Sequence, residues 1–154
     1  MSNFDSIKQL NYKLNTLDKN EKVKEYKMAI VFKIERIENG LAYGMLTWKD
    51  KNLSSGAVSG PYGKKQLPKG LYKAFRSKLL DKIGEPAYCD SINNCWFQVI
   101  DPQFSTERNN LGIHPDGNKS GTLGCIGLLN ANTKEWYDAF LSVDSGAFNY
   151  VEVI

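Results

Sequence analysis

The stretch from Leu111 to Leu129, LGIHPDGNKSGTLGCIGLL, holds the residue types that could do chemistry. His114, the only histidine of the chain, lies eleven residues before Cys125. A catalytic thiol needs a base, backbone amides aimed at a developing oxyanion, and room for the substrate. Glycines around Cys125 remove side chains where a substrate would approach, and they permit the positive φ angles that turn amides inward. The stretch therefore predicts a Cys–His pair suited to thiol-dependent acyl transfer.

Two other interpretations of these residues stay open. Buried cysteines mostly pack as small hydrophobic residues, and a single histidine is mostly structural. A zinc site would instead combine Cys89, Cys95, His114 and Cys125. The paired cysteines of zinc knuckles lie about two to four residues apart, whereas Cys89 and Cys95 are six apart, so the spacing disfavours zinc.

Three cysteines in one chain suggest one pair and one free thiol in an oxidising compartment. The turn-forming residues between Cys89 and Cys95 predict that these two form the disulfide. Two reduced thiols packed near Trp96 are the alternative.

The elements that must position these groups are mainly short strands. Asn39-Gly40 separates two β-prone runs, 28–38 and 41–48, which is a strong hairpin pattern. Further strands are expected at 57–59, 70–75, 95–100, 111–114, 125–129 and 150–154. Short strands with turns between them favour a mainly β fold with a sandwich-like or barrel-like core.

Two short helices are expected beside this core. Apolar residues three or four apart predict an amphipathic helix over 3–17, and a charged connection follows, so 1–27 is a helical, charged segment. The second helix follows a cap at Asn130 or Asn132, has Glu135 as capping-box partner, and ends near Gly146. Its expected apolar face consists of Trp136, Phe140 and Leu141.

The composition describes one ordinary globular domain. The chain has 154 residues, 42% hydrophobic and 24% charged, with 20 basic against 17 acidic residues. Disordered and fibrous classes are excluded. The basic run over 64–82 is interpreted as a solvated face, because no RNA-binding motif or helix-turn-helix spacing accompanies it; nucleic acid is not an expected partner. Charges interrupt the first 17 residues and apolar runs are short, so neither an export signal nor a membrane span is expected.

The stretch around Cys125 resembles the active-site motif of L,D-transpeptidase (YkuD-like) catalytic domains. In that motif a His precedes a Ser/Thr-x-Gly-Cys element, followed by a hydrophobic residue and, after one more position, another. The matching residues here are His114, Gly117, Thr122, Gly124, Cys125, Ile126 and Leu128. An upstream block, 54–74, is similar to the family's Ser-Gly strand and Pro-x-Gly-x-Tyr turn, with Pro68, Gly70 and Tyr72. The resemblance covers a catalytic domain over 28–154.

Two departures from the family pattern concern the residues beside the cysteine. Many members carry a His two residues before the Cys and an Arg two residues after it, where this chain has Leu123 and Gly127. His114 is then the only imidazole available, which is similar to a divergent branch that includes small antibacterial effectors. Arg108 is a candidate substitute for the missing Arg, with a structural role as its alternative. Either Asp116 or a backbone carbonyl would orient His114.

The resemblance implies acyl transfer on peptidoglycan stem peptides by a mainly β core without metal or cofactor. Cys125 would attack the carbonyl before the terminal D-amino acid, and His114 would carry the proton. The Gly124 and Cys125 amides are expected to form the oxyanion hole, with Thr122, Gly117 and Arg108 as further substrate-binding candidates. Trimming of the terminal D-Ala is expected as the main reaction, with exchange second.

The implied place of action is the bacterial periplasm or cell wall. Without an export signal, the chain would arrive through a secretion system or lysis, or the given sequence lacks its export segment. The secretion route would imply a cognate immunity protein as partner, besides the muropeptides. The alternatives are a catalytically inactive wall-binding module and a papain-like cysteine peptidase or amidase, in which the Cys precedes the His.

Overall fold

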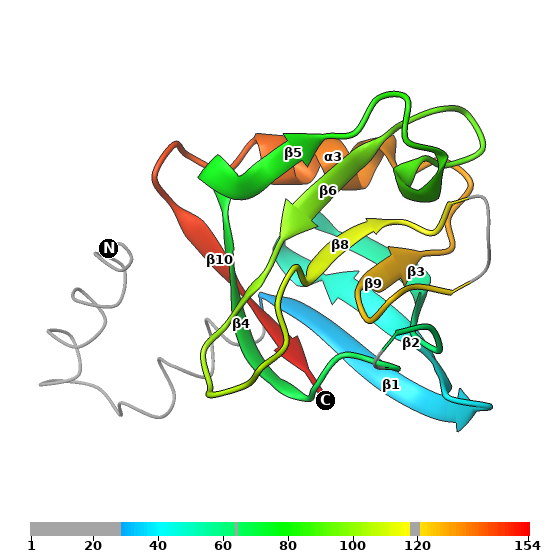
Figure 1. Cartoon of the computed structure of the whole chain (residues 1–154). Coiled ribbons are helices and arrows are strands. Elements are labelled where there is room, and N and C mark those ends of the chain that lie inside the picture. Colours follow the sequence, from blue (N-terminus) through cyan, green and yellow to red (C-terminus); the bar gives the residue numbers. More distant parts are fainter. Residues whose placement is uncertain (1–28, 64, 118–120) are drawn as a thin grey trace, which may run out of the picture.

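The computed structural model describes residues 29–63, 65–117 and 121–154. In this part of the chain ten strands form one mixed sheet, in the order β5-β6-β8-β9-β3-β2-β1-β10-β4-β7 (Figure 1). The strands are β1 (Ile30–Glu38), β2 (Leu41–Trp48), β3 (Leu53–Ser59), β4 (Gly70–Phe75), β5 (Leu79–Asp81), β6 (Trp96–Val99), β7 (Asp101–Pro102), β8 (Gly112–Pro115), β9 (Ile126–Leu128) and β10 (Phe148–Val153). The other elements are helix α3 (Lys134–Leu141) and the 3-10 turns η1 (Lys49–Lys51), η2 (Arg76–Lys78) and η3 (Pro86–Tyr88). The prediction of a mainly β core with few short helices is confirmed.

The segment 1–27, predicted to be helical and charged, lies outside the described residues. Among the residues that are described, no helix has the length and apolar character needed to cross a membrane.

The β1–β2 hairpin forms as predicted. Asn39 and Gly40 both have positive φ angles, 54° and 81°, and the two strands pair antiparallel from Ile30↔Trp48 to Glu38↔Leu41. Positive φ at both central residues matches the twist of the flanking strands. The alternation along β2 then buries every second side chain against the core.

Two short strands, β5 and β7, are absent from the sequence prediction. They have three and two residues, too few to display a period of two. Strand β3 also begins earlier than the expected 57–59 run, at Leu53. Its first half contains Ser54, Ser55 and Gly56, which resemble turn residues in sequence but pair with β2 in the sheet.

The sheet curls over its core, so that strands far apart in the sheet order meet. The chain leaves β4, near one end of the sheet, and passes through η2 into β5 at the other end. Gln98 Nε2 on β6 donates a hydrogen bond to the Phe75 carbonyl at the end of β4, at 3.0 Å. This curl places β6, β8 and β9 side by side on the part of the sheet that carries the candidate site.

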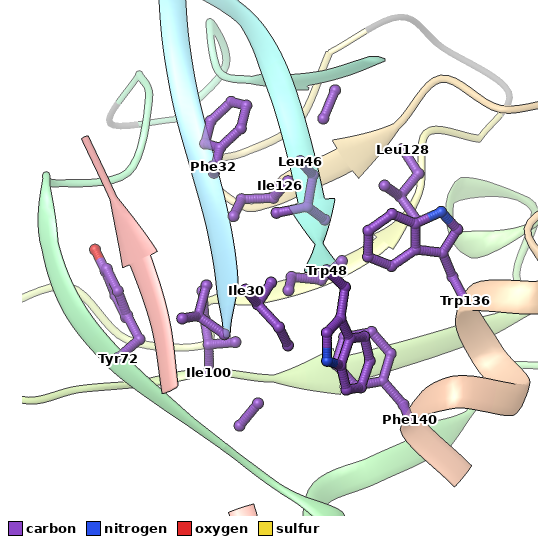
Figure 2. Packing of buried hydrophobic residues seen from close by; sticks show 14 of the residues in the cluster. Ile30, Phe32, Leu46, Trp48, Tyr72, Ile100, Ile126, Leu128, Trp136 and Phe140 are labelled. Carbon is purple, nitrogen blue, oxygen red and sulfur yellow. The ribbon is translucent and has the colours of Figure 1, made fainter. Parts of the chain in front are cut away.

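Large aromatic side chains fill the space between the sheet and α3 (Figure 2). Trp48 packs on Phe140 with ring centroids 4.8 Å apart, and Trp96 packs on the same ring at 5.8 Å. Trp136 and Phe140 are buried, as predicted. Leu141 is 43% exposed, which corrects its assignment to the apolar face, because it follows Phe140 by a rotation of about 100° around the helix.

The boundaries of α3 also differ from the prediction. The helix begins after Thr133 and ends at Leu141, five residues before Gly146. Asn132 Oδ1 still accepts the Lys134 amide at 3.0 Å, so this side chain contributes to the first turn. Thr133 is held by the Asp90 carboxylate, which accepts its amide at 2.7 Å.

Candidate active site

The pleat of two neighbouring strands brings His114 and Cys125 to one face of the sheet. Strands β8 and β9 are parallel, with Ile113 opposite Ile126 and His114 opposite Gly127. Ile113 and Ile126 are fully buried in the core. Since successive side chains on a strand point to opposite faces, His114 and Cys125 both project away from that core.

Both side chains line one cleft of about 1200 Å³. Residues of β5, β6, β8 and η3 line it, together with loops around residues 62–63, 107–111 and 121–123. Leu123, which stands where many family members carry a His, lies on the rim and is exposed. Cys125 is 8% exposed and His114 is 5% exposed, so both groups lie at the bottom of the cleft.

A backbone carbonyl orients the His114 imidazole. Its Nδ1 lies 2.6 Å from the Pro115 carbonyl oxygen, which can only accept, so Nδ1 carries the proton. Nε2 is therefore left with a lone pair, as a base requires. Burial lowers the pKa of His114 to about 4, despite the hydrogen bond to Pro115. Of the two orienting groups expected from sequence, the carbonyl takes this role, while Asp116 accepts the Gly121 amide at 3.3 Å.

The Cys125 thiol is neutral at rest. Burial raises its pKa to about 11, against the Gly112 amide and the Arg108 charge, which both favour the thiolate. Sγ donates to the Asn110 carbonyl oxygen at 3.4 Å. In the described part of the chain no hydrogen bond joins Sγ to His114, so the resting pair is a thiol and an uncharged imidazole in one cleft.

The Thr122 hydroxyl makes three hydrogen bonds that hold the turn before Cys125. Its Oγ1 donates to the Cys125 carbonyl at 2.7 Å and accepts the Gly124 and Gly60 amides, each at 3.1 Å. The Gly124 amide is therefore engaged within the protein, which corrects its assignment to the oxyanion hole. The Cys125 amide remains the candidate donor of the predicted pair.

Arg108 lies against the residue that precedes the cysteine. Gly124 has a φ of +123°, and a β-carbon there would come within 2.1 Å of Arg108 Nη2. Arg108 Nη1 also donates to the Gln66 carbonyl at 3.1 Å. A half-buried cation thus stands beside Cys125, although it comes from a different loop than the family's Arg.

Position 127 has no room for the Arg that many family members carry there. A β-carbon on Gly127 would come within 2.9 Å of Thr122 Cγ2 and 3.0 Å of Asp116 Oδ1. Neighbouring side chains fill this space, so the packing favours a glycine at position 127.

Gly117 has a packing role, whereas the sequence suggested that it binds substrate. A β-carbon on Gly117 would come within 2.2 Å of the Pro86 carbonyl oxygen and 2.6 Å of the Ala87 carbonyl carbon. The backbone of η3 therefore rests directly on this glycine.

The upstream block, 54–74, meets the cysteine element in space. The Thr122 amide donates to the Gly60 carbonyl oxygen at 2.7 Å, in addition to the side-chain bond already described. Within the block, the Tyr72 hydroxyl donates to the Pro68 carbonyl oxygen. Burial raises the pKa of Tyr72 and the Arg108 charge lowers it, which places this tyrosine within electrostatic reach of Arg108.

Two lysines of the basic run border the cleft. Lys78 pairs with Asp101 at 2.8 Å and Lys82 with Glu85 at 3.8 Å. The Lys82 side chain extends over a ring that lines the cleft, since its Nζ lies 5.2 Å from the Tyr88 centroid. The cleft therefore has an aromatic floor and a mildly basic border.

Sequence reasoning missed two rings that contact His114. Phe97 stacks on the imidazole, with centroids 5.5 Å apart and an interplanar angle of 13°. Tyr88 meets it edge-on at 5.0 Å and 81°. Trp96, Phe97 and Gln98 are all buried, so no alternation along β6 indicates which side Phe97 faces, and Tyr88 ends a 3-10 turn and follows no periodic pattern.

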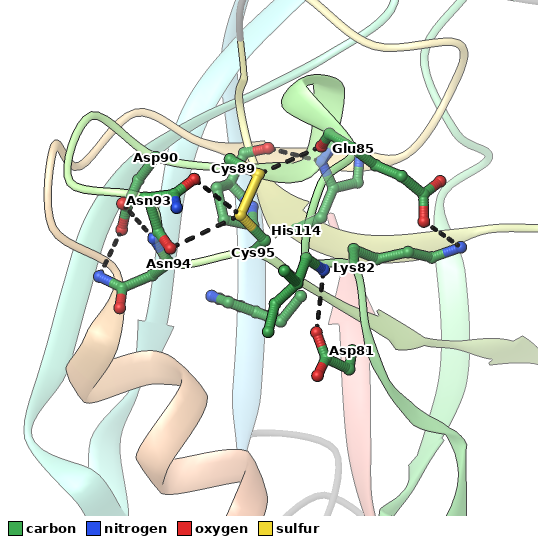
Figure 3. Close-up of a disulfide and its surroundings, with 12 residues drawn as sticks. Asp81, Lys82, Glu85, Cys89, Asp90, Asn93, Asn94, Cys95 and His114 are labelled. Carbon is green, nitrogen blue, oxygen red and sulfur yellow. Dashed lines mark hydrogen bonds and ion pairs between the residues drawn. A yellow bond between two sulfur atoms is a disulfide. The ribbon is translucent and has the colours of Figure 1, made fainter.

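Cys89 and Cys95 form a disulfide, as predicted, and Cys125 is the free thiol (Figure 3). The disulfide uses two of the thiols that a zinc site with His114 and Cys125 would need. Among the described residues no group of three His, Cys, Asp or Glu side chains is arranged to hold a metal ion.

Comparison of the whole chain with protein-family models, with curated proteins and with solved structures finds no match.

Proposed function

We propose that this protein performs cysteine-dependent acyl transfer on peptidoglycan stem peptides, in the manner of L,D-transpeptidases. One observation carries the proposal: His114 on β8 and Cys125, the residue before β9, line the same cleft, and the neutral imidazole has a lone pair on Nε2 to act as base. The cleft supports the proposal of a thiol-dependent reaction, and the resemblance of the motif around Cys125 supplies the proposed substrate class.

In the proposed reaction, Sγ attacks the carbonyl carbon before the terminal D-Ala while Nε2 of His114 takes the thiol proton. The C–N bond then breaks, and the imidazolium gives that proton to the leaving D-Ala amine. A thioester remains on Cys125. Water attacks it with His114 as base, and the thiol is restored as the tripeptide leaves. Because both groups are neutral at rest, proton transfer accompanies the attack.

Two groups would stabilise the charge that develops. The Cys125 amide can donate to the oxyanion, and a single donor of this kind is worth about 3 kcal/mol in comparable acyl transfers. The Arg108 cation beside Gly124 favours negative charge at this end of the cleft. Its approach to Gly124 and its electrostatic effect on the Cys125 thiol support a role in the site alongside its hydrogen bond to Gln66.

Hydrolysis is the proposed main outcome. Water needs no recognition, whereas a second stem peptide needs an acceptor groove, and the packing around Gly127 leaves no room for the family's Arg. The place of action would be the bacterial periplasm or cell wall. An antibacterial effector of this kind would be matched by a cognate immunity protein.

The test is incubation of the purified chain with disaccharide-tetrapeptide, with and without excess D-Met, followed by mass spectrometry. Tripeptide as main product, with a minor D-Met exchange product, supports the proposal. Cys125→Ala and His114→Ala should each abolish conversion while circular dichroism stays unchanged. Dimers dominating both mixtures would contradict trimming.

A catalytically inactive wall-binding module is the second candidate, and the resting state of the thiol favours it. Burial keeps Cys125 protonated, and the thiol bonds to Asn110 instead of His114. Binding of wild-type protein and Cys125→Ala to purified sacculi with equal affinity, without any change in the muropeptides, would select this function. A papain-like arrangement fits less well, because Cys125 precedes strand β9 and not a helix.

A further inference from the structure

The His114 imidazole belongs to a cluster of three rings. Phe97 covers one face of the imidazole, and the Tyr88 ring stands perpendicular to it. Tyr88 also meets Phe97 edge-on, with centroids 5.5 Å apart and an interplanar angle of 88°. Aromatic pairs in such geometries are attractive beyond the area they bury. The two rings together restrict the rotation of the imidazole.

Phe97 and Tyr88 are held in different ways. Phe97 lies in strand β6, paired with Leu80 on β5. Tyr88 ends η3, a turn outside the sheet. The nearby backbone bonds, Tyr88 N to Glu85 O at 2.9 Å and Cys89 N to Pro86 O at 3.2 Å, reach only three residues back. The connection beyond this turn runs through Cys89, whose backbone pairs with Cys95 in an antiparallel β-bridge next to the start of β6.

The disulfide makes that connection covalent. Cys89 directly follows Tyr88, and Cys95 directly precedes Trp96, the first residue of β6. The bridge thus joins the neighbour of Tyr88 to the strand that carries Phe97. Figure 3 shows His114 among the residues that surround the bridge. From the other side, the η3 backbone rests on Gly117, just after β8.

We propose that Tyr88 is a positioning residue for His114 and that the Cys89–Cys95 disulfide holds Tyr88 in place. Tyr88 acts through the imidazole, whose remaining restraints are the bond to Pro115 and the stack on Phe97. Its importance for catalysis rests on the proposed function, whereas its effect on the imidazole does not depend on any reaction. Loss of the ring would open His114 to water and let Nε2 leave its orientation.

The test uses His114 as a single-residue probe, because it is the only histidine of the chain. Its ring signals are followed by NMR through a pH titration in the wild type, Tyr88→Ala, Tyr88→Phe and Cys89→Ser/Cys95→Ser. The control is Tyr43→Ala, which removes a ring on β2 that lies under Arg36. Burial holds the pKa of His114 at about 4 in the wild type.

Tyr88→Ala and the double Ser variant should raise the His114 pKa by about one unit or more toward its ordinary value. Tyr88→Phe keeps the ring and should match the wild type, as should Tyr43→Ala. With the tetrapeptide, Tyr88→Ala should lower kcat about tenfold or more with a smaller change in KM, and Tyr88→Phe should restore kcat.

An unchanged His114 pKa in Tyr88→Ala would overturn the proposal, even if the double Ser variant fails to fold. A second outcome is that Tyr88→Ala shifts the His114 pKa while the wild type leaves the tetrapeptide intact. This result would support the positioning of the imidazole and overturn the proposed function. The two claims therefore fail separately.

Discussion

The Arg108 guanidinium lies directly against the α-carbon of Gly124, where a β-carbon would come within 2.1 Å of Nη2. Gly124 precedes Cys125, and the Arg108 charge lowers the pKa of that thiol against the larger effect of burial. The cation can stand beside the cysteine because residue 124 has no side chain.

Gly124→Ala should therefore displace Arg108. We expect it to destabilise the protein by about 1–3 kcal/mol, from the strained φ and the collision together. The matched control is Gly146→Ala, which has a similarly positive φ of +83° but no atom within 4 Å of the added carbon. Urea denaturation of both variants and of Gly124→Ala/Arg108→Ala measures the difference. If the added methyl collides with Arg108, Gly124→Ala/Arg108→Ala should be destabilised by less than the sum of the two single variants. Destabilisation equal to that sum would contradict the collision.

The Cys125 thiol should react slowly with iodoacetamide at neutral pH. Because its pKa is about 11, the thiolate fraction and the alkylation rate should rise about tenfold per pH unit between pH 7 and 9. Under non-reducing conditions Cys125 is the one free thiol of the structure, so mass spectrometry reads it directly. Arg108→Ala should lower the rate at each pH, and Arg36→Ala should not. A rate that levels off below pH 8 would show a preformed thiolate instead.

Asp116 should make the protein less stable as the pH rises through weakly acidic values. Burial raises the pKa of this carboxyl from 3.8 to about 6, although the Gly121 amide lowers it. Between these values the folded state binds a proton that the unfolded state has lost, so the free energy of unfolding falls as pH rises. Between pH 4 and 6.5 the free energy of unfolding of the wild type should fall by about 1–2 kcal/mol more than that of Asp116→Asn, allowing for partial solvent screening. Equal pH slopes in both proteins would refute this.

Asp90 should make the main stabilising contact between α3 and the loop that the disulfide closes, residues 89–95. Its carboxylate accepts the Thr133 amide at 2.7 Å, the Thr133 hydroxyl at 2.8 Å and the Asn94 amide at 2.9 Å. Burial raises the pKa of Asp90, but these hydrogen bonds outweigh burial and hold the pKa below its ordinary value. Asp90→Ala should cost about 2–3 kcal/mol at pH 7, whereas Asp50→Ala, at an exposed carboxylate, should cost under about 0.5.

The difference between wild type and Asp90→Ala should narrow as the pH falls below about 4, because the unfolded carboxylate takes up a proton there while the folded Asp90, with its lowered pKa, does so only at still lower pH. Thermal unfolding at pH 7 and pH 3 measures it. A difference that stays constant with pH would show that the loop is held by packing and not by this charge.

The strands around the site could be predicted because their apolar residues alternate. Ile113 and Ile126 mark the buried face, so the sequence already places His114 and Cys125 opposite to it. The parallel pairing of β8 with β9 could not be predicted, since short strands do not specify their neighbours.

The assignment of the Gly124 amide to the oxyanion hole needed correction for a related reason. Thr122 accepts amides from Gly124, two residues away, and from Gly60, sixty-two residues away. A local motif shows the glycine but not the long-range hydrogen bonding that orients the hydroxyl. Tyr88 was missed because a disulfide and a glycine contact, and no periodic pattern, place it against His114.

The measurement that tests the central claim most directly is mass spectrometry of the protein after acid quenching of its early reaction with disaccharide-tetrapeptide. Acyl transfer through Cys125 predicts a thioester adduct on the peptide that contains Cys125. The added mass should equal that of the substrate minus free D-alanine, which is the tripeptide product minus one water. The adduct should be absent from Cys125→Ala. Tripeptide formation by Cys125→Ala, or an adduct on another residue, would contradict the account.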